Sequence, residues 1–318
     1  MESLLPAPIR EAMTKMVRVA STDAHAELEV KVLAGRLQTK DEADRILEVL
    51  SERTTGGYTE THRATFSYPD GLRVHVTSPE HILKVCSSGS FRGVPLEVER
   101  KKRYSDISGE SDVVDVPDLK LRMTLRQEEA LRRDFSGSPM DPTNHVRILN
   151  RRSWRSADGL LRIDMSLVKS KTKSNKTLAD ILRQPPAYEL ELEVLNKKAD
   201  PAVLLRSLMH HAEAVVGAYQ QSPFILTESD MQRYKLEADA SRVPFLNPVT
   251  MARRHLMPGR PNSVLSGYTV TNKADGERCM LMVMRDRRLV RWTRKGGDRV
   301  WRDALDPAEQ QTLKRFFE

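Results

Sequence analysis

ELEVK at residues 27–31 and ELELE at residues 189–193 share one pattern, in which charged and apolar side chains alternate. In an extended strand, side chains two positions apart lie on one face, so each stretch predicts a strand with three ionisable groups on one side. Carboxylates gathered in an enclosed space repel one another unless a cation lies among them, and their oxygens suit Mg²⁺ or Mn²⁺. The two stretches therefore predict strands that line an enclosed, charged space and hold a divalent metal ion.

The composition restricts the class of partner and the compartment. The 318 residues include 52 Lys and Arg against 44 Asp and Glu, a formal charge of +8, and a basic surplus favours an anionic partner such as nucleic acid or a nucleotide. The spacing of Cys86 and Cys279 fits neither a metal site nor a disulfide framework, which indicates a reducing compartment. The sequence has neither an apolar run of membrane-spanning length nor a signal peptide. We expect a protein that is not secreted and has no membrane partner.

Strand-like segments dominate the first two-thirds of the chain, with Gly-, Asp- and Ser-rich turns between them. They lie at residues 27–33, 58–66, 72–76, 95–104, 119–127, 145–154, 160–168 and 187–194. Many short strands with few intervening helices favour an antiparallel barrel. We predict an α+β protein in which roughly eight antiparallel strands form a β-barrel tunnel with flanking helices.

Helix signals flank these strands. Thr39 and Glu42 form a capping box, and Asp200 precedes a proline at the start of an apolar helix. The character of the sequence changes near residues 221–228. We therefore expect residues 1–222 to form the tunnel domain, and residues 223–318 to form a linker and the N-terminal portion of a second, incomplete domain.

Basic residues alternate along the strands between the two glutamate stretches. Lys101 and Arg103 share one face of their strand and Arg100 and Lys102 the other, and the sequence leaves open which pair faces inward. A triphosphate carries about four negative charges, so hydrolysis of its terminal anhydride requires positive groups, an oriented water and a stabilised leaving diphosphate. A glutamate that does not bind metal can act as general base. Candidates for phosphate binding are Lys31, Lys101, Arg103, Arg122, Arg147, Arg151 and Arg162, and other candidate tunnel residues are Glu128, Asp164, Ser166 and Glu189.

The segment from about residue 20 to about residue 200 resembles the triphosphate tunnel metalloenzymes. Within them it is most similar to the RNA triphosphatase domain of the mRNA capping enzymes of large DNA viruses and of fungal type. Two glutamate-bearing strands hold the metal in that family. The resemblance implies removal of the γ-phosphate from 5′-triphosphate RNA with Mg²⁺ or Mn²⁺, and it implies these metal ligands: Glu27, Glu29, Glu191 and Glu193.

Two further segments carry the same resemblance. RRSW at residues 151–154 and LRIDMSLV at residues 161–168 are similar to paired strands that bring arginine to phosphate and an acidic residue, here Asp164, to the water or the metal shell. The chain departs from the family at Leu149, where a lysine is frequent. Phosphate binding would then depend more on Arg147, Arg162 or Lys169.

A second motif, KADGER at residues 273–278, follows an apparent strand. A lysine attacks an α-phosphate only when its amine is deprotonated, a glycine lets the backbone approach a nucleotide closely, and an arginine can hold phosphate or ribose. Lys273, Asp275, Gly276 and Arg278 resemble the first motif of the covalent nucleotidyltransferases, which include the mRNA guanylyltransferases. The resemblance implies that Lys273 attacks GTP to form a lysyl-GMP, which is then transferred to a 5′-diphosphate RNA end.

The elements that follow the nucleophile in that family are missing after residue 278. We therefore expect this chain to be the N-terminal part of a longer, multifunctional capping enzyme of a large DNA virus, and to be unable to complete guanylylation by itself. A methyltransferase domain or subunit could belong to the same enzyme. The expected location is the cytoplasm, in a viral factory, or the virion.

Two alternatives fit parts of the sequence. A general tripolyphosphatase or nucleoside triphosphatase of the tunnel family shares the ExExK strand, but the motif at residues 273–278 and the basic surplus disfavour it. A catalytically inactive RNA-binding module is disfavoured because all four matched glutamates are present.

Overall fold

The computed structural model of the chain describes residues 1, 4–33, 35–105, 111–132, 145–172, 185–222, 224–241, 252–258, 279–293 and 296–302. The chain divides into two compact units, Met1–Gln221 and Ser222–Glu318. The first unit contains α1 (Ala7–Thr22), β1 (Ala26–Val32), α2 (Lys40–Ser51), β2 (Thr54–Ser67), η2 (Pro69–Gly71), β3 (Leu72–Thr77), α3 (Pro79–Ser88), β4 (Glu97–Arg103), β5 (Val113–Val116), η3 (Pro117–Leu119), β6 (Leu121–Ala130), β7 (His145–Ser156), β8 (Leu161–Thr172), β9 (Ala187–Val194) and α6 (Pro201–Gln220).

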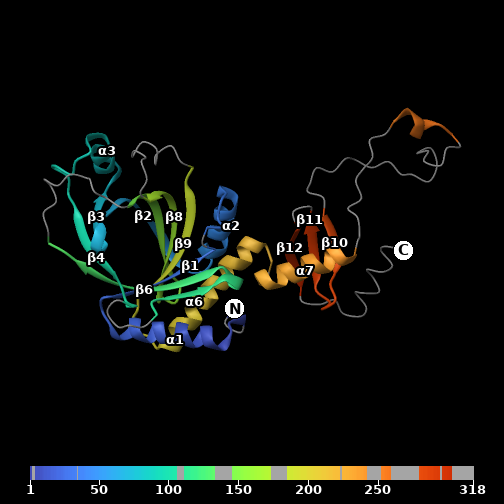
Figure 1. The fold of residues 1–318 in the computed structure, drawn as a ribbon, viewed down its shortest axis with the longest axis horizontal. Helices are drawn as coiled ribbons and strands as arrows, with labels where there is room; N and C mark the ends of the chain where they lie inside the picture. The colour runs from blue at the N-terminus through green and yellow to red at the C-terminus, as the bar shows by residue number, and fades with distance from the viewer. Residues whose placement is uncertain are drawn as a thin grey trace. The chain divides into compact units, whose positions relative to one another are not determined.

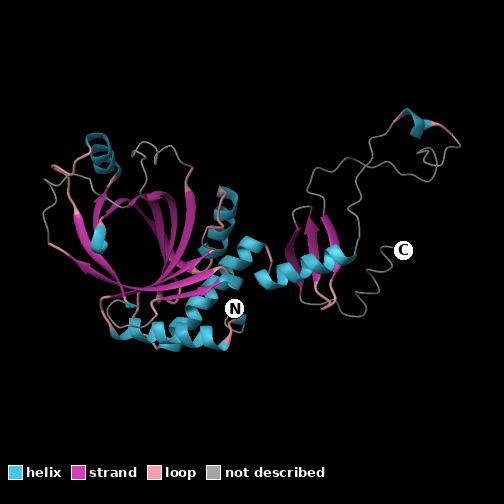
Figure 2. Cartoon of the chain, in the orientation of Figure 1, coloured by secondary structure: helices cyan, strands magenta, loops and turns pink. Residues whose placement is uncertain are grey.

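The strands of the first unit close into an antiparallel ring (Figures 1 and 2). Their hydrogen-bonded order is β1-β9-β8-β7-β2-β3-β4-β6, and β6 pairs back with β1. The short strand β5 pairs with Leu121–Thr124 of β6, next to the part of β6 that pairs with β4. The predicted antiparallel barrel of about eight strands with flanking helices is thus confirmed.

Alternation along β1 decides which of its side chains face the interior. Leu28 and Val30 are fully buried on the side of the strand that lies against α1 and α6. Because neighbouring side chains of a strand point to opposite faces, Glu27, Glu29 and Lys31 face the interior of the ring. The helices therefore cover the apolar outer side of this wall, and the charged side is left for the interior.

A second apolar cluster covers the outer side of β2 and β3. Phe66 of β2 packs edge-on against Phe91, with ring centroids 5.0 Å apart, and Ile82 and Val85 of α3 belong to the same cluster. Val74 of β3 is fully buried there. The polar residues that alternate with Val74 consequently face the interior.

The two predicted helix caps are confirmed. The Thr39 side chain accepts a hydrogen bond from the Glu42 backbone amide, and the Glu42 carboxylate accepts one from the Thr39 backbone amide. This reciprocal pair starts α2. The Asp200 side chain accepts hydrogen bonds from the amides of Ala202 and Val203 at the start of α6. These caps satisfy amides that have no partner within their own helices.

The second unit contains α7 (Glu228–Ser241), η4 (Arg253–Leu256), β10 (Cys279–Val283), β11 (Leu289–Thr293) and β12 (Gly296–Arg302). The three strands form an antiparallel sheet. Tyr234 of α7 packs with Met284 and Val290, and its hydroxyl donates a hydrogen bond of 2.7 Å to Asp286.

The strands β10, β11 and β12 all follow the KADGER motif along the chain. The KADGER motif and the apparent strand before it lie outside the described residues, so the nucleotidyltransferase assignment stays a prediction. None of the helices in the described parts of the chain is both long and apolar enough to cross a membrane.

Candidate functional site

The two glutamate stretches meet on one inner wall of the barrel. The strands β1 and β9 are antiparallel neighbours, with Glu29 opposite Glu193 and Lys31 opposite Glu191. Leu192 of β9 is fully buried on the outer side. Two segments far apart in the sequence therefore present their charged side chains to the same space.

Glu27, Glu29 and Glu193 form a group that we call the carboxylate cluster. One carboxylate oxygen of each lies within 4.8 Å of the others, and the side chains are only 15%, 15% and 16% exposed. Burial and the charge of Glu29 raise the pKa of Glu27. Burial also raises the pKa of Glu193 to about 7; Arg162 opposes the rise and Glu29 adds to it. These donors are all carboxylate oxygens that lie close together and partly repel one another, an arrangement that suits a hard divalent cation.

Lys101 of β4 reaches into the carboxylate cluster. Its ammonium contacts Glu27 and lies 2.7 Å from Glu128 and 3.9 Å from Glu29. Burial lowers the pKa of Lys101, but these carboxylates outweigh that effect and the pKa is raised. Burial likewise opposes ionisation of Glu128, yet a hydrogen bond with Glu27 and the charge of Lys101 hold the pKa of Glu128 below its usual range. The face of β4 that the sequence left open is thus settled for Lys101, which points inward.

Arg151 of β7 is the centre of a second group. Its guanidinium donates hydrogen bonds of 2.8 Å to Asp164, 2.7 Å to Glu191 and 3.0 Å to Ser166. Asp164 is 1% exposed and Glu191 is 3% exposed. Carboxylates this deeply buried need paired positive charge, and Arg151 supplies it to both.

Lys31 and Arg147 extend this group along the wall. Lys31 lies 2.8 Å from Glu191 and 3.3 Å from Glu189, and Arg147 lies 2.8 Å from Glu189. Burial favours the neutral form of Glu191, but Lys31 and Arg151 lower its pKa to about 2. We call this group the paired cluster; its members are Lys31, Arg147, Arg151, Asp164, Ser166, Glu189 and Glu191.

Arg162 of β8 joins the two clusters. Its Nε lies 3.1 Å from both carboxylate oxygens of Asp164, and its Nη2 contacts Glu193. Glu191 and Glu193 are neighbouring inward positions on β9, yet they belong to different clusters. Glu191, which the resemblance implies as a metal ligand, is bound by Lys31 and Arg151, whereas Glu193 contacts Arg162 and lies with the carboxylates of Glu27 and Glu29.

The other predicted site residues lie apart from the two clusters or fall outside the residues that the structure describes. Arg122 donates hydrogen bonds of 2.6 and 3.0 Å to Asp115 of β5 and is 52% exposed. Arg103 is exposed at the end of β4. The predicted nucleotide-binding residues lie outside the described residues; they are Lys273, Asp275, Gly276 and Arg278.

The sequence analysis did not predict one row of polar residues, which lies on the wall formed by β2, β3 and β4. The Thr65 hydroxyl lies 2.9 Å from His75 Nδ1, and His75 Nε2 lies 3.0 Å from the Glu99 carboxylate. Thr65 and His75 are 8% and 4% exposed. The alternation in LRVHVT at residues 72–77 could have indicated that His75 faces inward, because Val74 and Val76 occupy the opposite face.

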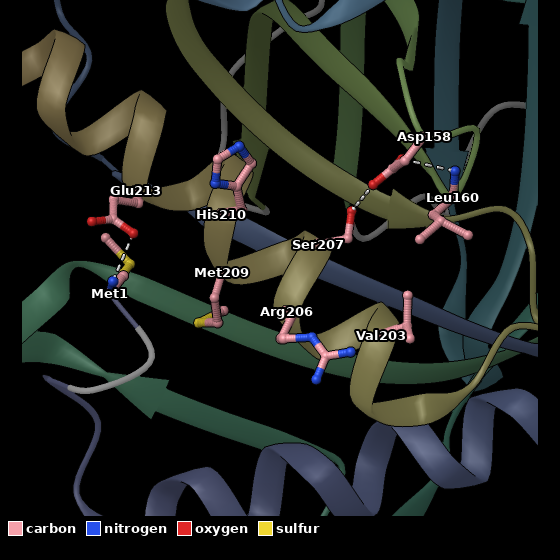
Figure 3. A pocket seen from close by; sticks show the side chains of 9 residues that line it. All are labelled: Met1, Asp158, Leu160, Val203, Arg206, Ser207, Met209, His210 and Glu213. Atoms are coloured by element: carbon pink, nitrogen blue, oxygen red, sulfur yellow. Dashed lines mark hydrogen bonds and ion pairs between the residues drawn. The ribbon is translucent and has the colours of Figure 1, made fainter.

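A cavity of about 490 Å³ lies outside the ring, beside α6 and the turn between β7 and β8 (Figure 3). Ser207 of α6 donates a hydrogen bond of 2.5 Å to Asp158 of that turn, and the amino group of Met1 lies 2.7 Å from Glu213. The hydrogen bond links α6 to the barrel wall, and the ion pair links α6 to the N-terminal residue. The grouping of carboxylates found in the barrel interior is not repeated among the residues that line this cavity.

Comparison with known proteins supports the fold. No protein-family model and no curated protein matches the chain. Among solved structures, the chain is similar to the triphosphatase of the mimivirus capping enzyme, with a TM-score of 0.52 and 18% identity over 66% of this chain and 98% of that chain. A structure of the RNA triphosphatase domain of the trifunctional mimivirus mRNA capping enzyme gives the same TM-score, with 20% identity over 67% and 99% of the two chains. At this identity the likeness shows that the chain has the fold of these RNA triphosphatase domains.

Proposed function

We propose that the barrel unit is a metal-dependent RNA 5′-triphosphatase, which removes the γ-phosphate of 5′-triphosphate RNA as the first step of cap formation. The observation that carries the proposal is the presence, inside one barrel, of the carboxylate cluster next to a row of cations. The fold shared with the mimivirus triphosphatase supports the same choice. The cations are Lys31, Arg147, Arg151 and Arg162.

The carboxylate cluster fits Mg²⁺ or Mn²⁺. Glu27, Glu29 and Glu193 would hold the ion, because they bring three carboxylate oxygens together and outnumber the two cations in contact with them, Lys101 and Arg162. Glu191 is the fourth ligand that the resemblance implies, but Lys31 and Arg151 already bind it. A bound divalent cation would neutralise phosphate oxygens and orient the triphosphate.

The cations of the paired cluster would bind the triphosphate. Arg147, Arg151 and Lys31 each contact a carboxylate now, so phosphate oxygens would replace these carboxylates as their partners. Arginine suits this exchange because its planar guanidinium binds carboxylate and phosphate with the same geometry. The interior is thereby preorganised for an anion of high charge before substrate arrives.

Glu191 would then act on the attacking water. When phosphate draws Lys31 and Arg151 away from it, the cause of its low pKa is removed, and its carboxylate can accept a proton. The water oxygen forms a bond with the γ-phosphorus, and the bond between that phosphorus and the bridging oxygen breaks. The products are inorganic phosphate and RNA with a 5′-diphosphate, whose new negative charge the arginines stabilise.

Release of γ-phosphate from terminally labelled RNA, with and without Mg²⁺ or Mn²⁺, tests the proposal. We expect release that depends on the metal and falls at least about a hundredfold in Glu29→Ala. Glu80→Ala serves as the matched control, because Glu80 is exposed on α3. RNA binding without any metal-dependent release would instead identify a binding module.

Tripolyphosphate as a competing substrate separates RNA triphosphatase from the runner-up, a general tripolyphosphatase or nucleoside triphosphatase. The ionic interior alone would accept any triphosphate, whereas the formal charge of +8 favours a polyanionic substrate such as RNA. We expect a higher kcat/KM for triphosphate-ended RNA than for tripolyphosphate or a free nucleotide. The reverse order would establish the runner-up.

We extend the proposal to residues 223–318 as the start of a guanylyltransferase within a longer viral capping enzyme that uses GTP. The KADGER motif at residues 273–278 supports this step. A labelled GMP adduct should form on the longer chain and be lost in Lys273→Ala. A stable adduct on the present 318 residues would contradict our expectation that further segments are required.

A further inference from the structure

Three side chains of β2 and β7 form a group of aromatic and cationic character, in which Tyr58 and Arg152 are exposed and Trp154 is half-buried. The rings of Tyr58 and Trp154 have centroids 5.5 Å apart and planes inclined by 52°. The guanidinium carbon of Arg152 lies 4.9 Å from the centroid of the Tyr58 ring. Tyr58 is 48% exposed and the Arg152 side chain is 46% exposed. An aromatic ring with an arginine against it is therefore left open to solvent.

This group lies on the outer face of the barrel wall. Arg151 points inward, where it binds Asp164 and Glu191. Because side chains alternate along a strand, Arg152 and Trp154 point outward. Tyr58 contacts both of them and shares that outer face.

An irregularity in β2 places Tyr58 beside Trp154. Thr55 pairs with Arg155 and Thr59 pairs with Ser153, so that residues 56–58 lie opposite a single residue of β7. Gly56 has a φ of +72°, which glycine adopts without the steric cost that other residues meet. A bulge redirects the side chains of its strand. This bulge directs Tyr58 toward the Trp154 ring and the Arg152 guanidinium of β7.

The group also lies close to one end of the barrel. Trp154 is two residues from the end of β7 at Ser156 and Tyr58 is four residues from the start of β2 at Thr54, which corresponds to about 7–13 Å along the strands. In the register of β7 and β8, Arg155 lies opposite Arg162. The Arg162 side chain contacts Glu193 of the carboxylate cluster on the inner face of the same wall. A polymer that leaves the reaction site over this rim would meet the group.

We propose that Tyr58, Arg152 and Trp154 form a nucleobase-stacking site, which binds single-stranded RNA that continues from the 5′ end held inside the barrel. Exposed aromatic rings and arginine planes are the groups on which proteins stack unpaired bases. Both side chains of the ion pair between Arg152 and Glu60, at 3.9 Å, are exposed. Such an exposed pair is weak, so a phosphate group readily replaces Glu60 as the partner of Arg152. The inference rests on the proposed RNA triphosphatase function for its choice of ligand.

Fluorescence anisotropy with a labelled 5′-hydroxyl oligonucleotide tests the site directly, because this ligand has no triphosphate. We expect the Kd of Tyr58→Ala for the single strand to be roughly tenfold weaker than that of the wild type. Tyr58→Phe, which keeps the ring, should bind like the wild type. Leu83→Ala is the control for truncation of an exposed apolar side chain, since Leu83 is 64% exposed on α3.

A duplex of the same sequence distinguishes stacking from simple attraction between charges. It carries more phosphate charge but hides its base faces, so Tyr58→Ala should leave duplex binding within about twofold of the wild type. Equal weakening for duplex and single strand, or an unchanged Kd for the single strand, would overturn the stacking site. Arg152→Ala gives a second variant, for which we expect weaker single-strand binding as well.

Steady-state kinetics separate this inference from the proposed function. In Tyr58→Ala, the KM for triphosphate RNA should rise roughly tenfold while tripolyphosphate hydrolysis stays unchanged. Unchanged KM values with an active wild-type enzyme would refute the stacking site alone. Absence of any triphosphatase activity in the wild type would refute the proposed function, and the oligonucleotide titration would still decide whether the stacking site exists.

Discussion

Glu191 and Glu193 occupy successive inward positions on one strand but differ in their charge surroundings. Lys31 and Arg151 bind Glu191 and lower its pKa to about 2. Glu193 lies beside Glu29, and burial raises its pKa to about 7 although Arg162 contacts it. The protein supplies its own countercharge in the paired cluster, whereas the carboxylate cluster keeps an excess of negative charge. The interior is thereby divided into a side suited to phosphate and a side suited to a cation.

Removal of the cation at the centre of the paired cluster should have the largest effect on stability. Arg151→Ala leaves Asp164 and Glu191 deeply buried with fewer positive partners. The expected loss in the free energy of unfolding is about 3–5 kcal/mol, measured by urea denaturation. Triphosphatase activity should fall with it, because the same guanidinium is a proposed phosphate ligand.

The neighbouring exposed arginine provides the control. Arg152 lies on the outer face of β7, where it forms an exposed ion pair with Glu60 at 3.9 Å. Arg152→Ala should cost less than about 1 kcal/mol. If Arg151→Ala were equally mild, the paired cluster would not be held together by its buried charges.

Glu193 and Glu191 should also affect the pH dependence of the free energy of unfolding in opposite directions. The folded-state pKa of Glu193 is raised to about 7, so its contribution is present below about pH 4.5 and is lost as the pH rises toward 7. The folded-state pKa of Glu191 is lowered to about 2, so its contribution is present above about pH 4.5 and is lost as the pH falls toward 2. Each effect is on the order of 3 kcal/mol.

Denaturation of the metal-free protein between about pH 2 and pH 8 measures both effects. Relative to the wild type, Glu193→Gln should gain stability as the pH rises through 5–7, because it removes a carboxyl group that burial disfavours in its charged form. Mg²⁺ should produce the same gain in the wild type. A Glu193→Gln curve parallel to that of the wild type would show that the two glutamates do not differ in this way.

The smallest effect is expected where a predicted phosphate ligand lies in an exposed pair. Arg122 binds Asp115 and is 52% exposed, unlike the arginines of the paired cluster. Arg122→Ala should change the free energy of unfolding by less than about 1 kcal/mol and leave kcat/KM for triphosphate RNA within a few-fold of the wild type. A loss as large as that in Arg151→Ala would restore Arg122 to the substrate site.

The sequence predicted the strands better than their partners. Alternation in ELEVK and ELELE indicates which face of each strand is charged, because that property is local to the strand. Pairing between distant strands is not local. That Glu29 lies opposite Glu193, and that Lys31 lies opposite Glu191, follows from the barrel register, and this register divides the four matched glutamates between two clusters.

Short and irregular elements account for the other differences. The strand β5 spans Val113–Val116 and brings Asp115 to Arg122, and so short a segment gives little periodicity to recognise. Residues 56–58 form the bulge that aims Tyr58 at Trp154, and its effect depends on β7 as well as β2. Lys101 was predicted as a phosphate ligand, and only the folded structure places its ammonium among the glutamates.

The most direct test of the divided interior is a titration with Mn²⁺, followed by the loss of the free-ion paramagnetic resonance signal. We expect Glu193→Gln to weaken Mn²⁺ binding at least about tenfold, and Glu191→Gln to bind Mn²⁺ within a few-fold of the wild type although it no longer releases phosphate from RNA. Equal loss of Mn²⁺ binding in the two variants would contradict the division, because Glu191 would then be a metal ligand like Glu193.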